Sequence, residues 1–304
     1  MNDPGAPPLA CRICAGKALL FHFEISDQRL WRCPQCGFVQ VEREPSAQVL
    51  DAIYSEAYFT SAKYRGDQVA LNRENARRLG LLRRWVPQGS DVLDAGCSTG
   101  DFVACAKREY EMHGLDYSPF AIEAAKADNP DLAHRLKSGR IEDTEWSGKL
   151  FDATCLWDVI EHIWDPVPVV RDLLSRIKPG GHLLLSTPAI DAVAARASGR
   201  YWPFMTPPEH LGFFSSRAFE SMVATLGGCE IVYSAHRGKW ANVAFIGYKI
   251  TRIAPRWFPR LLLWPLFQWP LKHLSLYVPT CDILYLVLRK QSQPRPSGVH
   301  EITR

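Results

Sequence analysis

Short apolar runs alternate with stretches of helical periodicity from about residue 89 to residue 290. The apolar runs predict strands at 91–95, 111–116, 150–157, 181–187, 229–235 and 282–289, and a weaker strand at 134–141. The periodic stretches between them predict helices at 101–109, 118–127, 166–178 and 215–226. Such alternation is typical of a parallel sheet that helices cover on both faces. The pattern therefore predicts a doubly wound α/β domain over residues 89–290.

Local signals mark several ends of these elements. Ser118 followed by Pro119 predicts a helix N-cap with a first-turn proline, and the sequence Pro179-Gly180-Gly181 predicts that a helix stops before the next strand. Ahead of the domain, residues 43–88 are expected to form a helical linker or cap that packs on its edge. The apolar face expected for this segment consists of Ala76, Leu79, Leu82 and Val86.

Two CxxC pairs dominate residues 1–42. Cys11 and Cys14 are separated from Cys33 and Cys36 by 18 residues, a spacing expected of a tetrahedral four-thiolate zinc site. Because protein ligands fill all four positions, we expect the metal to be structural and the unit to be a small zinc ribbon. The first ten residues lack a basic stretch followed by an apolar run, so the expected location is the cytoplasm.

Positive charge is concentrated in the C-terminal part of the chain. From Arg237 onward there are 11 Lys and Arg residues against 2 acidic ones, whereas the whole chain has a formal net charge of +4. Within a basic, hydrophobic insertion at 237–280, the longest uncharged run has 11 residues and includes two prolines, and a membrane-spanning helix needs about 20 apolar residues. We expect 251–280 to cover the substrate, to touch an anionic membrane surface, or to be a packed lid with solvated arginines. Residues 291–304 are expected to be a disordered tail.

The first strand of the domain runs into a glycine turn, in the sequence DVLDAGCSTGDF at 91–102. Gly96 and Gly100 allow the backbone to approach a ligand at the carboxyl end of this strand. Asp116 ends the next strand, where its carboxylate can accept both hydroxyls of a ribose. The loop lacks the G-x-G-x-x-G spacing that holds a pyrophosphate, and Asp94 suits a cationic ammonium or sulfonium group.

At this point the chain resembles the class I S-adenosylmethionine-dependent methyltransferases, over roughly residues 70–290. The resemblance is carried by DVLDAGCSTGDF, HGLDYSP, RIEDTEWSGKLFDATCLWDVIEHIWDP and LLSRIKPGGHLLLSTP. It implies a seven-stranded sheet whose last strand is antiparallel, which fits the strand expected at 282–289. It implies the following cofactor contacts: Asp94, Gly96, Cys97 and Gly100 around the methionine part, Asp116 and Tyr117 at the ribose, Asp143 at the adenine, and Trp157 and Asp158 beside the sulfonium.

The sequence WDVIEHIWDP holds candidates for handling a hydroxyl proton or a divalent cation. Asp158, Glu161 and His162 would share one face at the start of a helix. The stretch is similar to ubiquinone-pathway O-methyltransferases, in which E-x-x-E-H supplies a metal site and Mg²⁺ would be the expected ion. Here an aspartate replaces the first glutamate and shortens the reach. Alternatively, Glu161 and His162 only shape the pocket.

His210, in PPEHLGFFS, is the second candidate for the acceptor side. It lies among aromatic residues in a loop after the fifth strand, and such loops form the rim where substrates enter. The alternative is a packed loop histidine. No NPPY-like sequence follows the fourth strand, which favours oxygen acceptors over amide or exocyclic amine acceptors.

These observations predict a methyltransferase acting on an oxygen of a small molecule, a sugar or glycan, a lipid-linked compound or a secondary metabolite. The zinc unit would be a substrate cap or an interaction surface, because its charge is only mildly basic. Two alternatives stay open. One is an RNA methyltransferase in which the zinc unit and the basic segment form one track. The other is a cofactor-binding interaction protein without catalysis. The sequence leaves the oligomeric state open.

Overall fold

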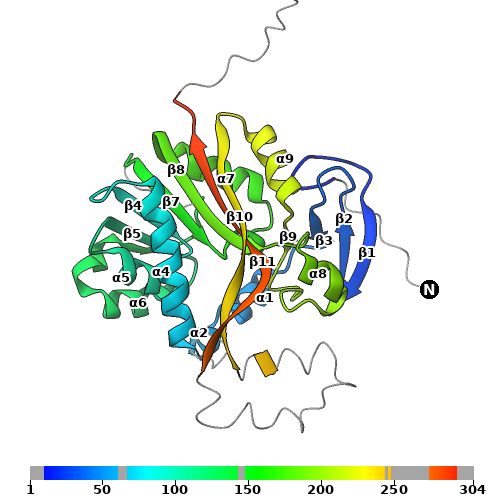
Figure 1. The fold of residues 1–304 in the computed structure, drawn as a ribbon, viewed down its shortest axis with the longest axis horizontal. Coiled ribbons are helices and arrows are strands. Elements are labelled where there is room, and N and C mark those ends of the chain that lie inside the picture. Colours follow the sequence, from blue (N-terminus) through cyan, green and yellow to red (C-terminus); the bar gives the residue numbers. More distant parts are fainter. Residues whose placement is uncertain (1–9, 61–66, 143–147, 244–245, 248–273, 293–304) are drawn as a thin grey trace, which may run out of the picture.

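The structure, a computed structural model, describes residues 10–60, 67–142, 148–243, 246–247 and 274–292. Two sheets organise this part of the chain: a four-stranded sheet in the order β1-β2-β3-β9 and a seven-stranded sheet in the order β10-β11-β8-β7-β4-β5-β6 (Figure 1). Helices flank the larger sheet, and the smaller sheet lies at one end of it.

The larger sheet confirms the predicted doubly wound fold with seven strands. Its central pairs are parallel, and the last strand along the chain is antiparallel to both of its neighbours. The strands are β4 (Asp91–Ala95), β5 (Glu111–Asp116), β6 (Leu136–Ser138), β7 (Phe151–Trp157), β8 (Ile177–Pro188), β10 (Cys229–Asn242) and β11 (Ser275–Lys290).

Two apolar clusters fill the two faces of this sheet. On one face Val92 and Leu184 pack with residues of α4 (Gln68–Trp85), α5 (Asp101–Ala106) and α6 (Pro119–Asp128). On the other face Leu93 and Leu185 pack with α7 (Pro166–Ser175), α8 (Val193–Ser198) and α9 (Ser216–Leu226). Neighbouring residues of one strand serve opposite clusters, because side chains alternate between the faces of a sheet. Shorter elements are α1 (Ala47–Ile53), α2 (Glu56–Thr60), η1 (Pro130–Arg135), η2 (Ile160–His162) and η3 (Gly199–Tyr201).

The signal at the start of α6 is confirmed, whereas the one at the end of α7 is wrong. Ser118 caps α6 by accepting the Ala121 N–H, with Pro119 in the first turn. Helix α7 already ends at Ser175, and β8 begins at Ile177 and runs through the Pro-Gly-Gly sequence. The register between β7 and β8 shifts there, since Phe151 faces Ile177 and Ala153 faces His182. The Pro-Gly-Gly sequence thus lies at a bulge-like irregularity within β8.

The face of α4 that packs on the domain agrees with the prediction except at Ala76, which is exposed. Leu79, Leu82 and Val86 are buried as expected, and the polar residues Asn75 and Arg78 also lie on the buried side. The helix contacts α5, β10 and β11. A buried stripe that mixes leucines with an arginine and an amide indicates that this helix also faces a polar site.

The predicted insertion at 237–280 is shorter than expected, because both of its ends belong to strands. Strand β10 continues to Asn242 and β11 begins at Ser275, and the two pair as an antiparallel ribbon with Trp240 opposite Tyr277. Residues 251–273, Asp143 and the tail beyond residue 292 lie outside the described residues. Within the described ranges, no helix is long and apolar enough to cross a membrane.

The N-terminal residues form the smaller sheet together with a strand from the main domain. Strands β1 (Leu20–Ile25), β2 (Gln28–Arg32) and β3 (Val39–Val41) are antiparallel, and β3 pairs with β9 (Gly212–Phe213). Phe38 and Phe214 pack across this junction, with ring centroids 4.9 Å apart. The N-terminal unit therefore shares both a sheet and a core with the main domain.

Candidate active site

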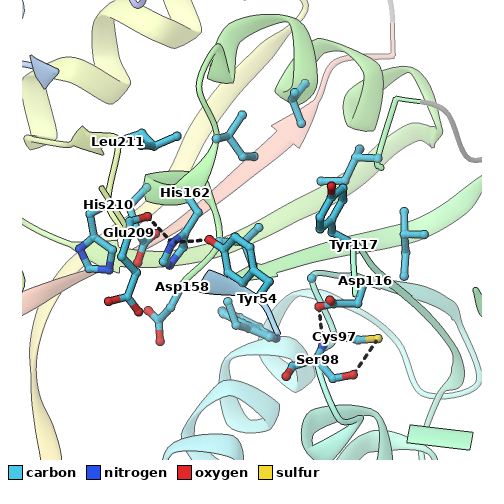
Figure 2. Close-up of a pocket in the computed structure, with 18 of the residues that line it drawn as sticks. Tyr54, Cys97, Ser98, Asp116, Tyr117, Asp158, His162, Glu209, His210 and Leu211 are labelled. Carbon is cyan, nitrogen blue, oxygen red and sulfur yellow. Dashed lines mark hydrogen bonds between the residues drawn. The ribbon is translucent and has the colours of Figure 1, made fainter. Parts of the chain in front are cut away.

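One cavity of about 1000 Å³ lies at the carboxyl ends of β4, β5 and β7. It is lined by residues from the glycine turn, the end of β5, the segment after β7, α1 and the loop before β9. Figure 2 shows two groups of polar side chains in it, Asp116 with Ser98 on one side and His162 with His210 and Glu209 on the other. Open α/β sheets bind ligands at this edge.

The glycine turn at residues 96–100 borders the first group of polar side chains. Gly96 has φ of +87°, and a Cβ atom there would lie 2.3 Å from Cγ2 of Val159. Gly100 has φ of +81° and is the N-cap residue of α5. Both positions need glycine, since the left-handed region and the close neighbours exclude a side chain. Because no side chain projects from these two positions, a ligand can approach the backbone closely.

Asp116 is held at the end of β5 by two backbone amides. Its Oδ2 accepts the Ser98 N–H at 2.8 Å and its Oδ1 accepts the Ser118 N–H at 2.9 Å. Burial raises the pKa of Asp116, and the two amides oppose that rise. A carboxylate oriented in this way can accept a pair of vicinal hydroxyls. Tyr117 next to it is 45% exposed and donates its hydroxyl to Asp51, so it lies at the rim.

Three buried polar atoms near the glycine turn have no hydrogen-bond partner among the described residues. They are Oδ1 of Asp94, Nε of Arg78 and Nε1 of Trp157. Burial raises the pKa of Asp94 to about 7, while Arg78 lowers it and Asp116 raises it further. Buried polar groups are nearly always paired in native proteins, so these atoms could bind a ligand that carries both a donor and an acceptor. The ammonium and carboxylate of a methionine moiety fit that requirement.

Asp158 is paired with protein groups on both of its oxygens. Nη2 of Arg78 lies 2.5 Å from Oδ2, and the Ser186 hydroxyl donates to Oδ1 at 2.8 Å. Burial opposes ionisation, but Arg78, Lys239 and Ser186 hold the pKa of Asp158 below its usual value. Asp158 also has φ of +57° and precedes the short η2 turn, so it does not share a helix face with Glu161 and His162 as predicted.

Arg78 is a site residue that the sequence analysis missed. Its only sequence signal is a charged residue on the stripe formed by Leu79 and Leu82. Cys97, in contrast, lies where expected as a small buried residue of the glycine turn, and burial raises the pKa of its thiol well above the usual value. A thiol in that state is a poor nucleophile.

The second group centres on two imidazole rings whose centroids are 4.7 Å apart, His162 and His210. Nδ1 of His162 lies 2.8 Å from the Glu209 carbonyl oxygen, and Nδ1 of His210 lies 2.7 Å from the Phe204 carbonyl oxygen. A carbonyl oxygen only accepts, so each of these contacts is a hydrogen bond when Nδ1 carries the proton. In that tautomer the lone pair of the neutral ring lies on Nε2, as a base requires.

Glu161 precedes His162 in η2 and is 2% exposed. The Thr187 hydroxyl donates to its Oε2 at 2.9 Å. Burial and the neighbouring charge of Asp158 raise the pKa of Glu161. Glu161, His162 and His210 each offer a ligand atom within 4.8 Å of the others. Two imidazoles with one carboxylate do not match the oxygen ligands that Mg²⁺ requires.

Two further residues near the imidazoles line the half of the cavity that would hold the acceptor, and neither carried a recognisable signal in the sequence. The hydroxyl of Tyr54, which follows α1, lies 3.0 Å from Nδ1 of His162. Lys239 of β10 lines the same cavity, with its Nζ 5.2 Å from the centroid of the Phe204 ring. Both come from segments far in sequence from the glycine turn, and only the fold brings them to the cavity.

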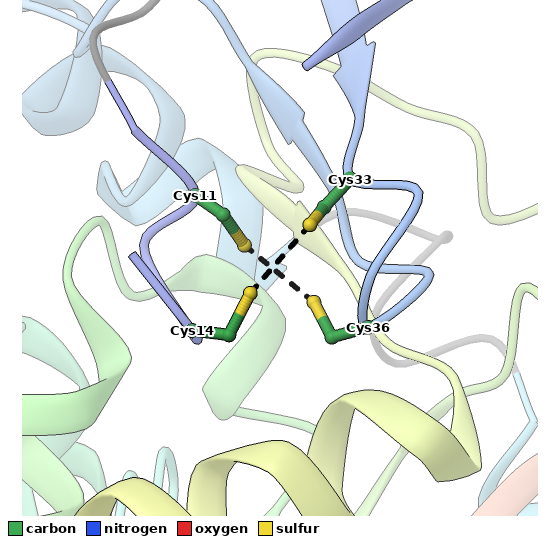
Figure 3. A group of neighbouring side chains, drawn as sticks. All are labelled: Cys11, Cys14, Cys33 and Cys36. Atoms are coloured by element: carbon green, nitrogen blue, oxygen red, sulfur yellow. Dashed lines mark hydrogen bonds between the residues drawn. The ribbon is translucent and has the colours of Figure 1, made fainter. Parts of the chain in front are cut away.

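The side chains of the four N-terminal cysteines point toward one another (Figure 3). The Sγ atoms of Cys11 and Cys36 are 3.5 Å apart, and those of Cys14 and Cys33 are 3.6 Å apart. All four lie within 4.8 Å of one another. Tetrahedral zinc with bonds of about 2.3 Å places sulfurs about 3.8 Å apart. The geometry therefore fits a four-thiolate zinc ion.

Comparisons with known proteins find similarity to methyltransferases. The family described as "Methyltransferase domain" matches residues 67–233. The ubiquinone biosynthesis O-methyltransferase of Xanthomonas axonopodis pv. citri (strain 306) is 33% identical over 134 residues, which is 40% of this chain and 53% of that protein. A probable S-adenosylmethionine-dependent methyltransferase of Mycolicibacterium smegmatis is 33% identical over 33% of this chain and 38% of its own length. The chain thus spans about half or less of the length of these curated relatives.

Solved structures show the same fold at low sequence identity. A putative methyltransferase from Bacillus halodurans C-125 has a TM-score of 0.51 at 14% identity, covering 71% of this chain and 99% of that one. The N-methyltransferase NodS from Bradyrhizobium japonicum WM9, solved with S-adenosyl-L-homocysteine, has a TM-score of 0.50 at 14% identity, covering 81% and 98%. The family match extends over more than half of the chain. The chain therefore belongs to the methyltransferase-domain family and has the fold of these solved methyltransferase structures.

Proposed function

We propose that this protein methylates a hydroxyl oxygen of a small-molecule acceptor, with His162 or His210 as the base. The observation that carries the proposal is the pair of imidazoles, each with Nδ1 at a backbone carbonyl oxygen, in the same cavity as the residues that would bind the cofactor. A neutral imidazole with its lone pair on Nε2 can take a hydroxyl proton near neutral pH. The names of the curated relatives, ubiquinone biosynthesis O-methyltransferases, support an oxygen acceptor.

S-adenosylmethionine would bind through the buried polar atoms that have no partner in the described part of the protein and through residues at the end of β5. Asp94 would take the ammonium, Arg78 the carboxylate, Asp116 and Tyr117 the ribose, and Trp157 would lie beside the sulfonium. When bound, S-adenosylmethionine supplies an electrophilic methyl group. The remaining task of the chain is to align the acceptor oxygen with that methyl group, exclude water and remove the hydroxyl proton. Asp158 would act indirectly, by fixing Arg78.

The acceptor half of the cavity suits a ring compound with hydroxyl groups. Phe204, Trp164 and Tyr54 offer aromatic faces, and Glu209 and Lys239 offer polar contacts among the lining residues. Such a mixture of aromatic walls with a few polar groups is typical of sites for small organic ligands. A phenol or a sugar fits this description. Mg²⁺ would have no part in this reaction, because the ligand set of Glu161, His162 and His210 does not suit that ion.

The N-terminal unit would hold a structural zinc ion through Cys11, Cys14, Cys33 and Cys36. The short sulfur separations and the absence of a position for water among four thiolates support a structural role. Through the pairing of β3 with β9, the unit would form one wall behind the acceptor half.

The test is methylation of a panel of phenols and sugars with isotopically labelled S-adenosylmethionine, read by mass spectrometry. We expect a gain of one methyl group on an oxygen, and loss of that product in His162→Gln and His210→Gln. Labelled RNA together with salt-sensitive RNA binding would favour the RNA methyltransferase alternative instead. Bound cofactor without labelled product from any acceptor would favour a protein without catalysis.

A further inference from the structure

Arg12 lies between the first two cysteines of the N-terminal unit, and its backbone is fixed there. Its N–H donates to Oε1 of Gln40 at 3.0 Å, and Nε2 of Gln40 donates to the Ala10 carbonyl oxygen at 3.1 Å. The carbonyl of the preceding residue, Cys11, accepts the Ala15 N–H at 2.9 Å. The arginine therefore starts from a backbone that the cysteine loop and β3 hold in place.

The guanidinium of Arg12 reaches from this loop into the main domain. Nη1 donates to the Trp164 carbonyl oxygen at 2.9 Å, and Nη2 donates to the carbonyl oxygens of Val41 and Leu211, each at 3.1 Å. Its central carbon lies 3.7 Å from the centroid of the Trp164 ring. Burial lowers the pKa of Arg12 to about 10, which still leaves the group charged at neutral pH. A planar fork of donors stacked on an aromatic ring is an arrangement that lysine cannot copy.

Two of these three carbonyls belong to the segments that carry the candidate bases. Trp164 is two residues beyond His162, and Leu211 directly follows His210. The two segments also meet where the Leu211 N–H donates to the Glu161 carbonyl at 2.7 Å and where Glu209 accepts from the His162 ring. Arg12 thus bonds to both sides of the junction that sets the distance between the imidazoles.

We propose that Arg12 is a positioning residue, which fixes the segments of His162 and His210 and makes the four-cysteine unit a working part of the acceptor site. The inference rests on the proposed function, since it gives these histidines their task. The hydrogen bonds of the Arg12 guanidinium go to backbone carbonyls, and among the described residues none goes to a histidine ring or to a residue that would bind the cofactor. Arg12 would therefore act through the Trp164 and Leu211 carbonyls. Without its donors, the 209–211 segment would keep the bond that the Leu211 N–H donates to the Glu161 carbonyl and the bond that the Leu211 carbonyl accepts from the Val41 N–H. The Glu209 carbonyl could then move away from the His162 ring.

The experiment compares Arg12→Met with Arg32→Met in the full-length protein. Arg32 is an exposed arginine of the same unit, so the two variants remove the same chemistry from different places. Long-range ¹H–¹⁵N spectra of the histidine side chains report which ring nitrogen carries the proton, and His162→Gln identifies the signal. Zinc content and the affinity for S-adenosylhomocysteine are measured on the same samples, and Arg12→Lys is included as the conservative variant.

We expect Arg12→Met to lose the single Nδ1–H form of His162, while Arg32→Met keeps it. Zinc content should equal that of the parent, and the dissociation constant of S-adenosylhomocysteine should change by less than about twofold. Once an acceptor is in hand, kcat should fall by about a hundredfold, the usual effect of misplacing a reacting group by about 1 Å. Arg12→Lys should recover only part of either signal.

Two results would overturn the inference. One is a His162 spectrum in Arg12→Met identical to that of the parent. The other is a parallel loss of zinc or of S-adenosylhomocysteine affinity, which would make Arg12 a general folding residue. The spectra need no acceptor, so they separate this inference from the proposed function. A parent enzyme that methylates no hydroxyl compound would contradict the proposed function and leave the coupling to Arg12 standing.

Discussion

The two halves of the cavity are built in different ways. The cofactor half comes from the ends of two adjacent parallel strands, so Asp94, Gly96 and Asp116 lie within 23 residues of one another along the chain. The acceptor half combines Tyr54 after α1, the turn after β7, the loop before β9, and Lys239 of β10. One half depends on a local strand-turn-helix unit, whereas the other depends on long-range packing.

This difference implies that the halves can be damaged separately. The Asp116 carboxylate is held by backbone amides of its own unit, and the glycine turn is fixed by β4 and α5. The imidazoles contact backbone carbonyls of the 204–209 loop. This loop leads into β9, which pairs with β3 of the N-terminal sheet. Perturbing the N-terminal unit should therefore change turnover before it changes cofactor affinity.

The largest effect is expected for Cys33→Ser. Removing one thiolate should release the zinc ion, because structural zinc binding is coupled to the folding of its unit. Turnover should be lost, while the affinity for S-adenosylhomocysteine in calorimetry stays within about twofold. Cys105→Ser, at a half-buried cysteine of α5, is the matched control and should leave zinc content and turnover unchanged. Equal zinc in Cys33→Ser and in the parent would contradict the account.

The next largest effect should come from the candidate bases. His162→Gln or His210→Gln should lower kcat by about 10²- to 10⁴-fold, the usual contribution of a general base. The dissociation constant of S-adenosylhomocysteine should stay within about twofold, since neither ring lies in the cofactor half. His134→Gln, at an exposed histidine, serves as the control. If both catalytic variants kept parental kcat, the base would have to be another group.

The reverse pattern is expected for Asp116→Ala. The ribose hydroxyls would lose a charged acceptor that contributes about 1.5–3 kcal/mol, so affinity should fall by about ten- to a hundredfold. The zinc content and the Nδ1–H form of His162 should not change. Calorimetry with Asp131→Ala, which removes an exposed aspartate of η1, gives the baseline. Parental affinity in Asp116→Ala would move the ribose away from the end of β5.

The smallest effect is a pH dependence confined to the cofactor half. Burial raises the pKa of Asp94 to about 7, and an ammonium ligand favours the ionised form. Affinity for S-adenosylhomocysteine should therefore rise by about tenfold between pH 6 and pH 8, with proton release on binding. The free protein should lose stability as the pH rises from about 4 towards 7, because the unfolded chain releases this proton earlier. Calorimetry in buffers of different ionisation enthalpy measures the proton release. Asp94→Asn should abolish it, and an identical release in that variant would assign the proton to another group.

The residues of the cofactor half could be predicted from the sequence because they lie at the ends of predicted strands. Gly96 directly follows one predicted strand and Asp116 ends the next, and parallel pairing brings such positions to one edge of the sheet. The strand pattern likewise predicted the strands of the larger sheet, whereas the antiparallel direction of β11 was implied by the family resemblance. The contribution of Arg78 stayed hidden, because a single charge in a helix is read as solvated unless its partner, here Asp158, is known.

The acceptor half could be predicted only in parts. His162 and His210 stood out as residues, but the 4.7 Å separation of their rings depends on the β3–β9 pairing and on the Arg12 contacts, which join distant segments. The proposed helix face of Asp158 failed because that residue adopts a left-handed conformation and is paired with Arg78. Sequence periodicity carries no information on either feature.

The most direct measurement is a crystal structure of the protein with S-adenosylhomocysteine. The account predicts ribose hydroxyls bonded to the Asp116 carboxylate, the amino acid end between Asp94 and Arg78, and the sulfur facing the cavity half of His162 and His210. A nucleoside bound away from the end of β5, or a sulfur turned away from the two histidines, would contradict it.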